Sequence, residues 1–586
     1  MRILILLLAL TTSVMTSQAS ISYSIAFPRA NAHYVTVTIS GQVDAGKHTL
    51  IMPVWTPGSY KVREFSQHVD GFNADLDGAD MPVLRADKNT WEVTTSKAGN
   101  LRFTYEVYAF ELGVRTSYVD ATKAFVHGVS AFMYWKGREA ESILLDVSNP
   151  SSWNDVFVSL PKEGNSWKAA NFDLLADSPI ACGTFDSVTY ESGGCPHTVV
   201  MIGKGSYQLD TIARDFKTIS DIEVNLFDGV HPSSQYIHFI QNVDQGGGGL
   251  EHLNCQTSQV NRWAYSDEKK YRSFLGLVAH EYFHLWNVKR IRPIELGPFD
   301  YTTENYTDQL WVAEGITSYY DDLFLKRAGF HTEESYLDVV SSSINRLENM
   351  SGRNVMTLDE ASKLAWIKAY LPNENSQNVT ISYYNKGMLV AWLLDLKIME
   401  MTHGKKRLDD VMRLLYSNWK KNDVGFTVDE FEQACSSVAG KSLTAFFNTY
   451  VRSTTPLPYD QMAKYLGLEL KNKADVQSAF LGMRIKVEGG KSIVSFVQSE
   501  GPALFAGMQV NDEIIAFDGW RVQGDLTDEI NRMKPEKEVE VIYSRDGEMR
   551  RCKLTPIPNQ TVEYQLKRLE NPSKVQAEAY QKWLEN

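Results

Sequence analysis

The chain has 586 residues, of which 43% are hydrophobic and 22% are charged. At roughly 150 residues per domain this length predicts three or four domains, and the ordinary globular composition excludes a disordered, collagen-like or low-complexity protein. Asp and Glu number 72 against 59 Lys and Arg, which gives a formal net charge of −13. This acidic balance disfavours nucleic acid and anionic lipid as general partners.

The amino terminus has the pattern of a cleavable export signal over residues 1–19. Arg2 precedes the apolar run Ile3–Leu10, and the segment finishes with small residues up to Ala19. A membrane anchor would need about 20 apolar residues, whereas Thr11 begins a polar interruption. We therefore expect an exported protein, periplasmic or secreted, with no stable membrane span.

Five cysteines occur, an odd number that leaves at least one thiol unpaired or paired between chains. Cys182 and Cys195 are separated by turn residues and suit a disulfide that staples a hairpin in an oxidising compartment. Five separate thiols are an equal alternative. No pair has the Cys-x-x-Cys spacing of a thiolate metal site.

The first part of the chain, to about residue 161, alternates apolar and polar residues between frequent turn signals, which predicts an all-β domain. The pattern then becomes mixed, with a helix predicted near Asp210–Ile219 and a strand at Tyr236–Ile240. The glycine run 246–249 that follows predicts a tight loop.

From about residue 269 to residue 450 the apolar residues recur at three- and four-residue intervals, which predicts a helical body. Its predicted helices include Arg272–Val288, Met388–Met399 and Leu408–Leu415. The stretch from Thr454 to about Asp475 contains two prolines and predicts a linker, and a small β-rich unit follows to about residue 557.

The strongest chemical signal is His280-Glu281-x-x-His284 within the predicted helix 272–288. Residues four apart leave the same face of a helix, so both imidazoles can bind one metal ion while Glu281 reaches a water on that metal. A catalytic zinc site takes three protein ligands and keeps an open position for water. A third ligand is therefore expected elsewhere in the chain.

Glu314 is the predicted third ligand. It lies among apolar and small residues in the segment Leu310–Tyr320. Burial of a carboxylate in such a segment costs several kcal/mol unless the group is paired or bound to a cation. Next to the His-Glu-x-x-His helix, a metal provides that partner.

This segment resembles the Leu-Trp-Leu-x-Glu-Gly-x-x-x-Tyr stretch of zinc aminopeptidases of the aminopeptidase N type. The spacing between His284 and Glu314 is longer than in aminopeptidase N and is similar to that of a sister family, the PDZ-containing glycyl aminopeptidases. The resemblance implies an enzyme with one Zn²⁺ that acts on peptides with a free amino terminus, small first residues such as Gly or Ala being preferred. A His-His-Glu set can also take cobalt or manganese.

Two further segments resemble motifs of these families. Gly248-Gly249-Leu-Glu251-His252 is similar to Gly-x-Met-Glu-Asn, in which the Glu binds the substrate's α-amine; this chain has His where the family has Asn. The resemblance gives Gly248 and Gly249 a substrate-binding role beside Glu251.

The second segment, Tyr384-Asn-Lys-Gly387, is similar to Tyr-x-Lys-Gly, whose Tyr donates to the oxyanion. The register of the motif favours Tyr384 over the adjacent Tyr383. The amino-terminal segment Val54–Tyr60 also resembles the glycyl aminopeptidases, with a plain turn and a substrate role equally open.

Residues 480–483 and 501–515 resemble bacterial PDZ domains, in which a Leu-Gly loop binds a peptide carboxylate. Such a module either binds a peptide carboxyl terminus or packs against the peptidase and closes its cleft.

The predicted architecture is multidomain α+β with a thermolysin-like catalytic domain, as the resemblance implies. The predicted parts are a signal peptide (1–19), an N-terminal β domain (20–165), the catalytic domain (166–330), a helical domain (331–455), a PDZ domain (470–557) and a C-terminal tail (558–586). Glu281 is the predicted proton acceptor. The alternatives are a zinc endopeptidase that uses the PDZ domain to recruit substrates and a PDZ scaffold without activity.

Overall fold

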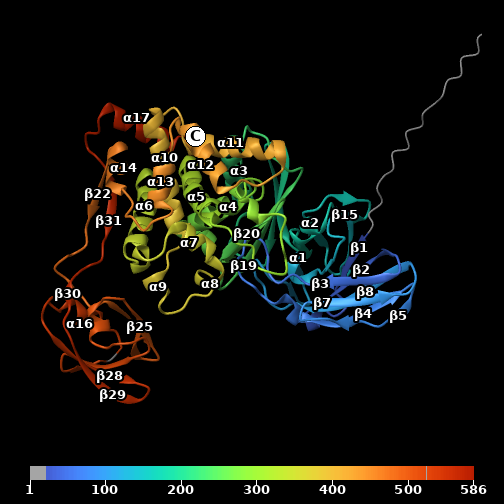
Figure 1. Cartoon of the computed structure of the whole chain (residues 1–586), viewed down its shortest axis with the longest axis horizontal. Coiled ribbons are helices and arrows are strands. Elements are labelled where there is room, and N and C mark those ends of the chain that lie inside the picture. The colour runs from blue at the N-terminus through green and yellow to red at the C-terminus, as the bar shows by residue number, and fades with distance from the viewer. Residues whose placement is uncertain (1–20, 523, 586) are drawn as a thin grey trace, which may run out of the picture. The chain divides into compact units, whose positions relative to one another are not determined.

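The computed structural model describes residues 21–522 and 524–585, so the predicted signal segment 1–19 lies outside the described residues (Figure 1). The chain divides into two compact units. The first comprises Met1–Val54, Glu64–Leu112 and Thr116–Thr184. The second comprises Trp55–Arg63, Gly113–Arg115 and Phe185–Asn586. None of the described helices is both long and apolar enough to span a bilayer.

The first unit is built from strands, as the alternating pattern predicts. Its sheets have the orders β14-β15-β12-β1-β2-β8-β4-β5, β13-β16-β10-β9 and β11-β3-β7-β6. Apolar residues of the central strands, such as Val35, Val37 and Ile39, are fully buried, while their neighbours face outward. The elements are β1 (Ile21–Ala26), β2 (Tyr34–Val43), β3 (Gly46–Ile51), β4 (Val69–Leu76), β5 (Ala79–Met81), β6 (Leu84–Arg85), β7 (Thr90–Thr95), β8 (Gly99–Tyr108), β9 (Tyr118–Val119), β10 (Ala124–Val126), α1 (Gly128–Ala131), β11 (Tyr134–Trp135), β12 (Ile143–Ser148), β13 (Asp155–Val158), β14 (Lys162–Glu163), β15 (Ser166–Ala169), α2 (Phe172–Ala176) and β16 (Ile180–Gly183).

This unit runs to Thr184, beyond the predicted boundary at residue 165, because β15 pairs with β12 and β16 pairs with β13 and β10. Of the two alternatives left open for the cysteines, the described residues show the separate thiols and not the Cys182–Cys195 disulfide. Cys182 lies in β16 opposite Ala124, whereas Cys195 lies in the second unit opposite Ser192. All five cysteines are free thiols.

The second unit begins with a five-stranded sheet of order β17-β18-β19-β21-β20. Helices α3 and α4 contribute Phe216 and Val278 to a core that also contains Val199 and Ile240 from the strands. The sheet therefore supports α4, the helix that carries the two histidines of the metal-binding motif. The elements are β17 (Asp186–Ser192), β18 (Cys195–Ile202), α3 (Leu209–Leu226), β19 (Tyr236–Val243), β20 (Gly248–Glu251), β21 (Cys255–Asn261) and α4 (Glu268–Phe283).

The helical body follows, with α10 at its centre. Leu389–Leu394 of α10 are fully buried, so this helix is apolar on all sides. The predicted helices 388–399 and 408–415 lie within α10 and α11, both of which are longer than expected. The elements are η5 (Trp311–Gly315), α5 (Ile316–Arg327), α6 (Glu333–Glu348), α7 (Leu358–Lys363), α8 (Ala365–Lys368), α9 (Ser376–Val379), α10 (Tyr383–Thr402), α11 (Leu408–Asn422), α12 (Val428–Ala439), α13 (Thr444–Tyr450) and α14 (Tyr459–Tyr465).

The C-terminal part departs from the sequence-based expectation at both ends of the PDZ segment. The expected linker 454–475 contains α14 and β22, and the expected tail contains β31 and α17. Strands β22 and β31 pair with each other and so flank the PDZ segment in the chain. The elements are β22 (Leu468–Asn472), β23 (Ala479–Phe480), β24 (Met483–Glu488), β25 (Lys491–Val497), α15 (Pro502–Phe505), β26 (Glu513–Phe517), β27 (Trp520–Arg521), α16 (Thr527–Asn531), β28 (Val539–Arg545), β29 (Glu548–Leu554), β30 (Ile557–Pro558), β31 (Tyr564–Arg568) and α17 (Lys574–Leu584).

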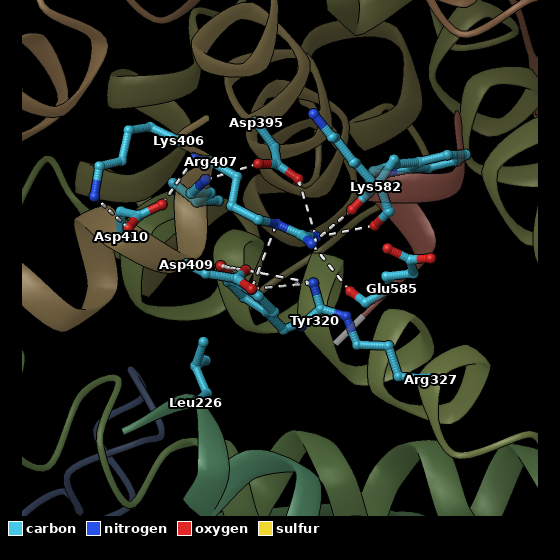
Figure 2. A network of polar contacts seen from close by, with 12 residues as sticks. Leu226, Tyr320, Arg327, Asp395, Lys406, Arg407, Asp409, Asp410, Lys582 and Glu585 are labelled. Carbon is cyan, nitrogen blue, oxygen red and sulfur yellow. Dashed lines mark hydrogen bonds and ion pairs between the residues drawn. The ribbon is translucent and has the colours of Figure 1, made fainter. Parts of the chain in front are cut away.

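Helix α17 is held to the helical body by Arg407 (Figure 2). The guanidinium of Arg407 donates to the backbone carbonyls of Lys582, Trp583 and Glu585 at 2.9 to 3.0 Å. The same group lies 3.4 Å from a carboxylate oxygen of Asp409. This buried cation satisfies the carbonyls at the end of α17, which have no partner within the helix.

Candidate metal centre

Helix α4 presents the two histidines of the predicted site. The Asp267 side chain accepts from the backbone N–H of Lys270 and caps the start of the helix. The helix ends at Phe283, earlier than the predicted end at residue 288, so His284 is the residue that caps it. His280 and His284 still project to the same side, with ring centroids 4.7 Å apart.

Glu314 meets both histidines from a second element. It lies in η5, a single π-helical turn at the start of α5, and is buried. Its Oε2 is 3.3 Å from His280 Nε2 and 3.2 Å from His284 Nε2. Such π-helical turns are frequent at functional sites. The structure thus brings together the three residues that the sequence predicted as metal ligands.

The remaining ring nitrogens fix the orientation of the two imidazoles. Nδ1 of His284 lies 2.6 Å from the backbone carbonyl of Asn287, to which it donates, and Nδ1 of His280 lies 3.0 Å from a carboxylate oxygen of Asp321. With Nδ1 protonated, each Nε2 carries its lone pair toward Glu314. Metal-binding histidines have this arrangement, so the donor set fits a zinc ion. Asp321 was not predicted from the sequence.

The electrostatics of the cluster also fit a cation. Burial alone would lower the pKa values of His280 and His284. The carboxylates of Asp321 and Glu314 raise the pKa of His280 above its ordinary value, and those of Glu314 and Glu251 raise the pKa of His284. Burial alone would raise the pKa of Glu314, but His284 and His280 hold it below its usual range. Positive charge is therefore stabilised at this position in the protein.

Glu281 and Glu251 lie beside the three residues. One donor atom each of Glu251, Glu281 and His284 lies within 4.8 Å of the others, and all three side chains are buried. Burial raises the pKa of Glu281. Gly249 allows the strand to approach, since a Cβ there would lie 2.2 Å from Glu281 Oε1. His252, by contrast, is buried in the turn after β20 and does not line the cavity.

Tyr384 reaches the cavity from α10, whereas Tyr383 is buried behind it. The Tyr384 ring lies 6.2 Å from the His280 ring, centroid to centroid, and lines the cavity that holds the three predicted ligands. Gly315 and Gly387 make this possible, because a Cβ on Gly315 would lie 2.5 Å from the Cα of Gly387. The two glycines of the family motifs thus let η5 and α10 touch.

The cavity has a volume of 290 Å³. Its lining includes Arg115, which was not predicted, and Gly58, which belongs to the segment 54–60 for which the sequence left a plain turn and a substrate role open. Gly58 and Arg115 come from Trp55–Arg63 and Gly113–Arg115, the two short segments that leave the first unit and belong to the second. A Cβ on Gly58 would lie 2.5 Å from both carboxylate oxygens of Glu251. The remaining lining residues are Gly248, Gly249, Glu251, Leu277, His280, Glu281, His284, Glu314, Asp321 and Tyr384.

A second buried cluster contains Cys195, His197 and His231, whose donor atoms lie within 4.8 Å of one another. Its electrostatics are opposite to those of the first cluster. Burial lowers the pKa of His197 to about 4 and that of His231 to about 3, and it raises the pKa of the Cys195 thiol to about 12. These groups are neutral at pH 7 and pack as core, so the cluster does not resemble the site around His280.

Comparisons with known proteins agree with this architecture. The M61 glycyl aminopeptidase family matches residues 273–390, the peptidase M61 N-terminal domain matches residues 22–184, and the PDZ domain matches residues 479–555. Aminopeptidase N of Haemophilus influenzae is 23% identical over 326 residues, which cover 54% of this chain and 33% of that protein. The chain therefore spans about a third of the length of this curated relative.

The crystal structure of an aminopeptidase N family protein from Idiomarina loihiensis superimposes with a TM-score of 0.90 at 28% identity. The match covers 97% of this chain and 100% of that one. The agreement extends over the β, catalytic, helical and PDZ regions together. In its N-terminal, catalytic and PDZ domains, the chain matches the PDZ-containing M61 metallopeptidase family.

Proposed function

We propose that this protein is a zinc aminopeptidase that removes the first residue of peptides with a free amino terminus. The observation that carries the proposal is the convergence of His280 Nε2 and His284 Nε2 on Glu314 Oε2 at 3.3 and 3.2 Å, with Glu251 and Glu281 beside them. His280, His284 and Glu314 would hold one zinc ion, which when bound supplies a Lewis acid for the scissile carbonyl and for water.

The chain's own residues would carry the proton and stabilise the charge. Glu281 would accept the proton of the attacking water and deliver it to the leaving amine, a task that suits a carboxylate whose pKa burial raises. Tyr384 would donate from its hydroxyl to the developing oxyanion. Tyr383 does not line the cavity, which supports the choice of Tyr384. Asp321 would hold the ring of His280 in place.

The carboxylate of Glu251 supports exopeptidase action. Glu251 and Glu281 are buried within 4.8 Å of each other and form no ion pair in the described part of the chain. Two such carboxylates favour a cation between or beside them, and the ammonium of a peptide provides one. An endopeptidase would have no charge to place there.

The walls around Glu251 support a small first residue. Gly58 lies against the carboxylate, and Tyr60, which is buried, lies close enough for the charges of Glu314 and Glu251 to add to the rise in its pKa that burial causes. Trp366 packs edge-on against Tyr60, with ring centroids 5.7 Å apart. Tyr60 and Trp366 pack behind the residues that line the cavity, so Gly58 is the part of this segment that limits the space at the carboxylate. We infer that Gly and Ala fit beside Glu251 more readily than large first side chains.

Elemental analysis and peptide hydrolysis test the proposal together. We expect one zinc per chain and chelator-sensitive release from Gly- and Ala-anilides that is faster than release from Leu-anilide. Glu281→Gln should keep the zinc and lose about 1,000-fold or more in kcat. Absence of zinc from the purified protein, or hydrolysis that a chelator does not affect, would contradict the assignment.

The Glu251→Gln variant separates the two peptidase hypotheses. Removal of the charge should lower kcat/KM for peptides with a free amine by about 10- to 100-fold. Neither the wild-type protein nor Glu251→Gln should cleave N-acetylated peptides. Glu374→Gln, at an exposed position away from the cavity, is the matched control. Equal cleavage of acetylated and free peptides would favour the endopeptidase, and an inactive wild-type protein with zinc bound would favour the scaffold.

We also propose that the PDZ domain binds a peptide carboxyl terminus. Strand β24 lies at one end of the sheet order β24-β25-β26-β28-β29, so one of its edges is free for an added strand. Gly482 before it has φ +69°, and a Cβ there would lie 2.8 Å from the Cα of Gly501. Titration of the full chain with one peptide in free-acid and amidated forms tests this; equal affinity would leave cleft closure as the role.

We further propose that the protein is exported, because residues 1–19 have the pattern of a secretory signal. The mass of the mature chain after expression tests this proposal. An intact Met1 on the purified native protein would contradict it.

A further inference from the structure

Arg115 is a cationic residue in the proposed active-site cavity that the mechanism above does not use. It lines the cavity together with Glu251 and the three predicted metal ligands His280, His284 and Glu314. Its Nη2 donates to the backbone carbonyl of Gly249 at 3.1 Å, while its Nε is buried without a partner. Among the described residues it forms no ion pair, although four acidic side chains line the same cavity. Its remaining N–H groups are therefore free to bind a ligand.

The segment that carries Arg115 is firmly held. Val114 beside it is buried, and the carbonyl of Gly113 accepts from Gln241 Nε2 at 3.1 Å. Gly113–Arg115 belongs to the catalytic unit although the chain on either side of it belongs to the first unit. A residue fixed in this way is preorganised, and preorganisation lowers the entropy lost on binding.

The register of β20 places Arg115 and Glu251 along the same strand edge. The N–H of His252 bonds to the carbonyl of Cys255 in the turn, so the backbone groups of residues 252, 250 and 248 face β21. Those of Gly249 and Glu251 therefore face the free edge, since β20 is the last strand of its sheet. Arg115 binds the outward carbonyl of Gly249, two residues from the carboxylate proposed to hold the substrate's amine.

Two residues of a strand span about 6 to 7 Å. The ammonium and carboxylate of an extended dipeptide are separated by a similar distance, at about 3.3 to 3.6 Å per residue. A guanidinium offers parallel N–H donors that match a carboxylate, which makes Arg the usual residue for such recognition. The cavity thus carries a group for each end of a short peptide.

We propose that Arg115 binds the carboxylate of the substrate and that the enzyme prefers dipeptides and tripeptides with a free carboxyl terminus. The proposal rests on the proposed aminopeptidase function and adds a size limit at the other end of the substrate. A carboxylate on the side chain of the second residue has the same chemistry, so the experiment includes a substrate that carries its carboxylate there.

The test compares Gly-Gly, Gly-Gly-amide and Gly-Asp-amide as substrates of the zinc-loaded full-length protein. We expect kcat/KM for Gly-Gly to exceed that for Gly-Gly-amide by about 10- to 100-fold, the range for a charged hydrogen-bonded pair. In Arg115→Gln this ratio should fall close to 1, with Arg115→Lys between the two. Arg214→Gln, an exposed arginine of helix α3, should leave the ratio as it is in the wild type.

Binding to the Glu281→Gln protein gives a second readout without turnover. The ratio of the calorimetric affinities for Gly-Gly and for Gly-Gly-amide should depend on Arg115 in the same way. A wild-type ratio of kcat/KM near 1, or a ratio that Arg115→Gln leaves unchanged, would overturn the proposal. If Arg115 only held β20 in place, Arg115→Gln would lower kcat/KM equally for all three substrates and leave the ratio unchanged. If only Gly-Asp-amide had a kcat/KM that depended on Arg115, the assignment of Arg115 to the C-terminal carboxylate would be overturned. Failure to hydrolyse any of the three would instead refute the proposed function.

Discussion

Substitution of Gly58 by Ala tests whether the segment Trp55–Arg63 forms part of the amine-binding site. The backbone at Gly58 has φ +79°, and a Cβ there would lie 2.5 Å from both oxygens of Glu251 and 2.7 Å from its Cδ. The shortest contact is about 1 Å below the van der Waals optimum of about 3.5 Å. Either the segment or the Glu251 carboxylate must therefore move by nearly that amount.

The two consequences differ in size and can be measured separately. The left-handed backbone costs an alanine about 1 kcal/mol in the free energy of unfolding. Displacement of a substrate-positioning group by about 1 Å can lower kcat/KM by about 100-fold, which exceeds the backbone effect. The loss in activity should thus be larger than the loss in stability accounts for.

Gly440→Ala is the matched control. Gly440 has φ +71°, and a Cβ added there would meet no atom within 4 Å, so this variant should show the stability loss alone. The assays are urea denaturation and kcat/KM for Gly-anilide. Full activity of Gly58→Ala, or an equal loss of activity in both variants, would refute the reasoning that the segment positions Glu251.

Three further predictions follow from the side chains. Tyr384→Phe should lower kcat by about 100-fold with little change in KM, while Tyr383→Phe should not; equal losses would remove the distinction between them. Arg407→Ala should lower the free energy of unfolding by about 3 to 5 kcal/mol in urea denaturation, because it removes the cation beside the buried Asp395 and frees the end of α17, while Asp409 keeps Arg327. A loss below about 1 kcal/mol would contradict the buried network. His197 and His231 have pKa values lowered to about 4 and about 3, so between these values and about 6.5 the unfolded chain binds protons that the folded chain does not. The free energy of unfolding should therefore fall as the pH drops from about 6.5 to about 3. An unchanged slope in a variant with Gln at both positions would exclude them as the cause.

The predicted site residues that the structure brings together share a local signal. His280 and His284 are one helical turn apart, and Glu314 stands in an apolar segment where a carboxylate needs a partner. Helix periodicity and strand alternation likewise predicted the β unit and most of α10. Each of these inferences depends on neighbours within a few residues, which is the range over which a single sequence is informative.

The residues whose roles were missed or left open come from distant segments. Arg115 and Asp321 have no local motif, and the role of Gly58 depends on its approach to Glu251, far away in the sequence. Contacts of this kind follow from tertiary packing, which no periodicity reports. The close approach of Gly315 and Gly387 is an intermediate case: both glycines stood in recognised motifs, but their function became visible only when η5 and α10 were seen to touch.

Helix α17 was missed although its signal was present. Ser573 and Gln576 form a capping box, and Tyr580 and Trp583 lie on the buried face that follows. The sequence analysis assigned residues 558–586 to a C-terminal tail and predicted no helix there. A start signal followed by apolar residues at helical spacing is sufficient to predict one.

The two histidine clusters show why residue type alone does not define a metal site. Around His280 and His284, buried carboxylates contribute negative charge: Glu314 raises the pKa values of both rings, with Asp321 acting on His280 and Glu251 on His284. Around His197, burial dominates and lowers the pKa, so the ring stays neutral and the Cys195 thiol keeps its proton. Buried carboxylates need a cation, and a metal ion must displace any protons that its ligands hold. The carboxylates, more than the imidazoles, thus distinguish the proposed zinc site from ordinary core.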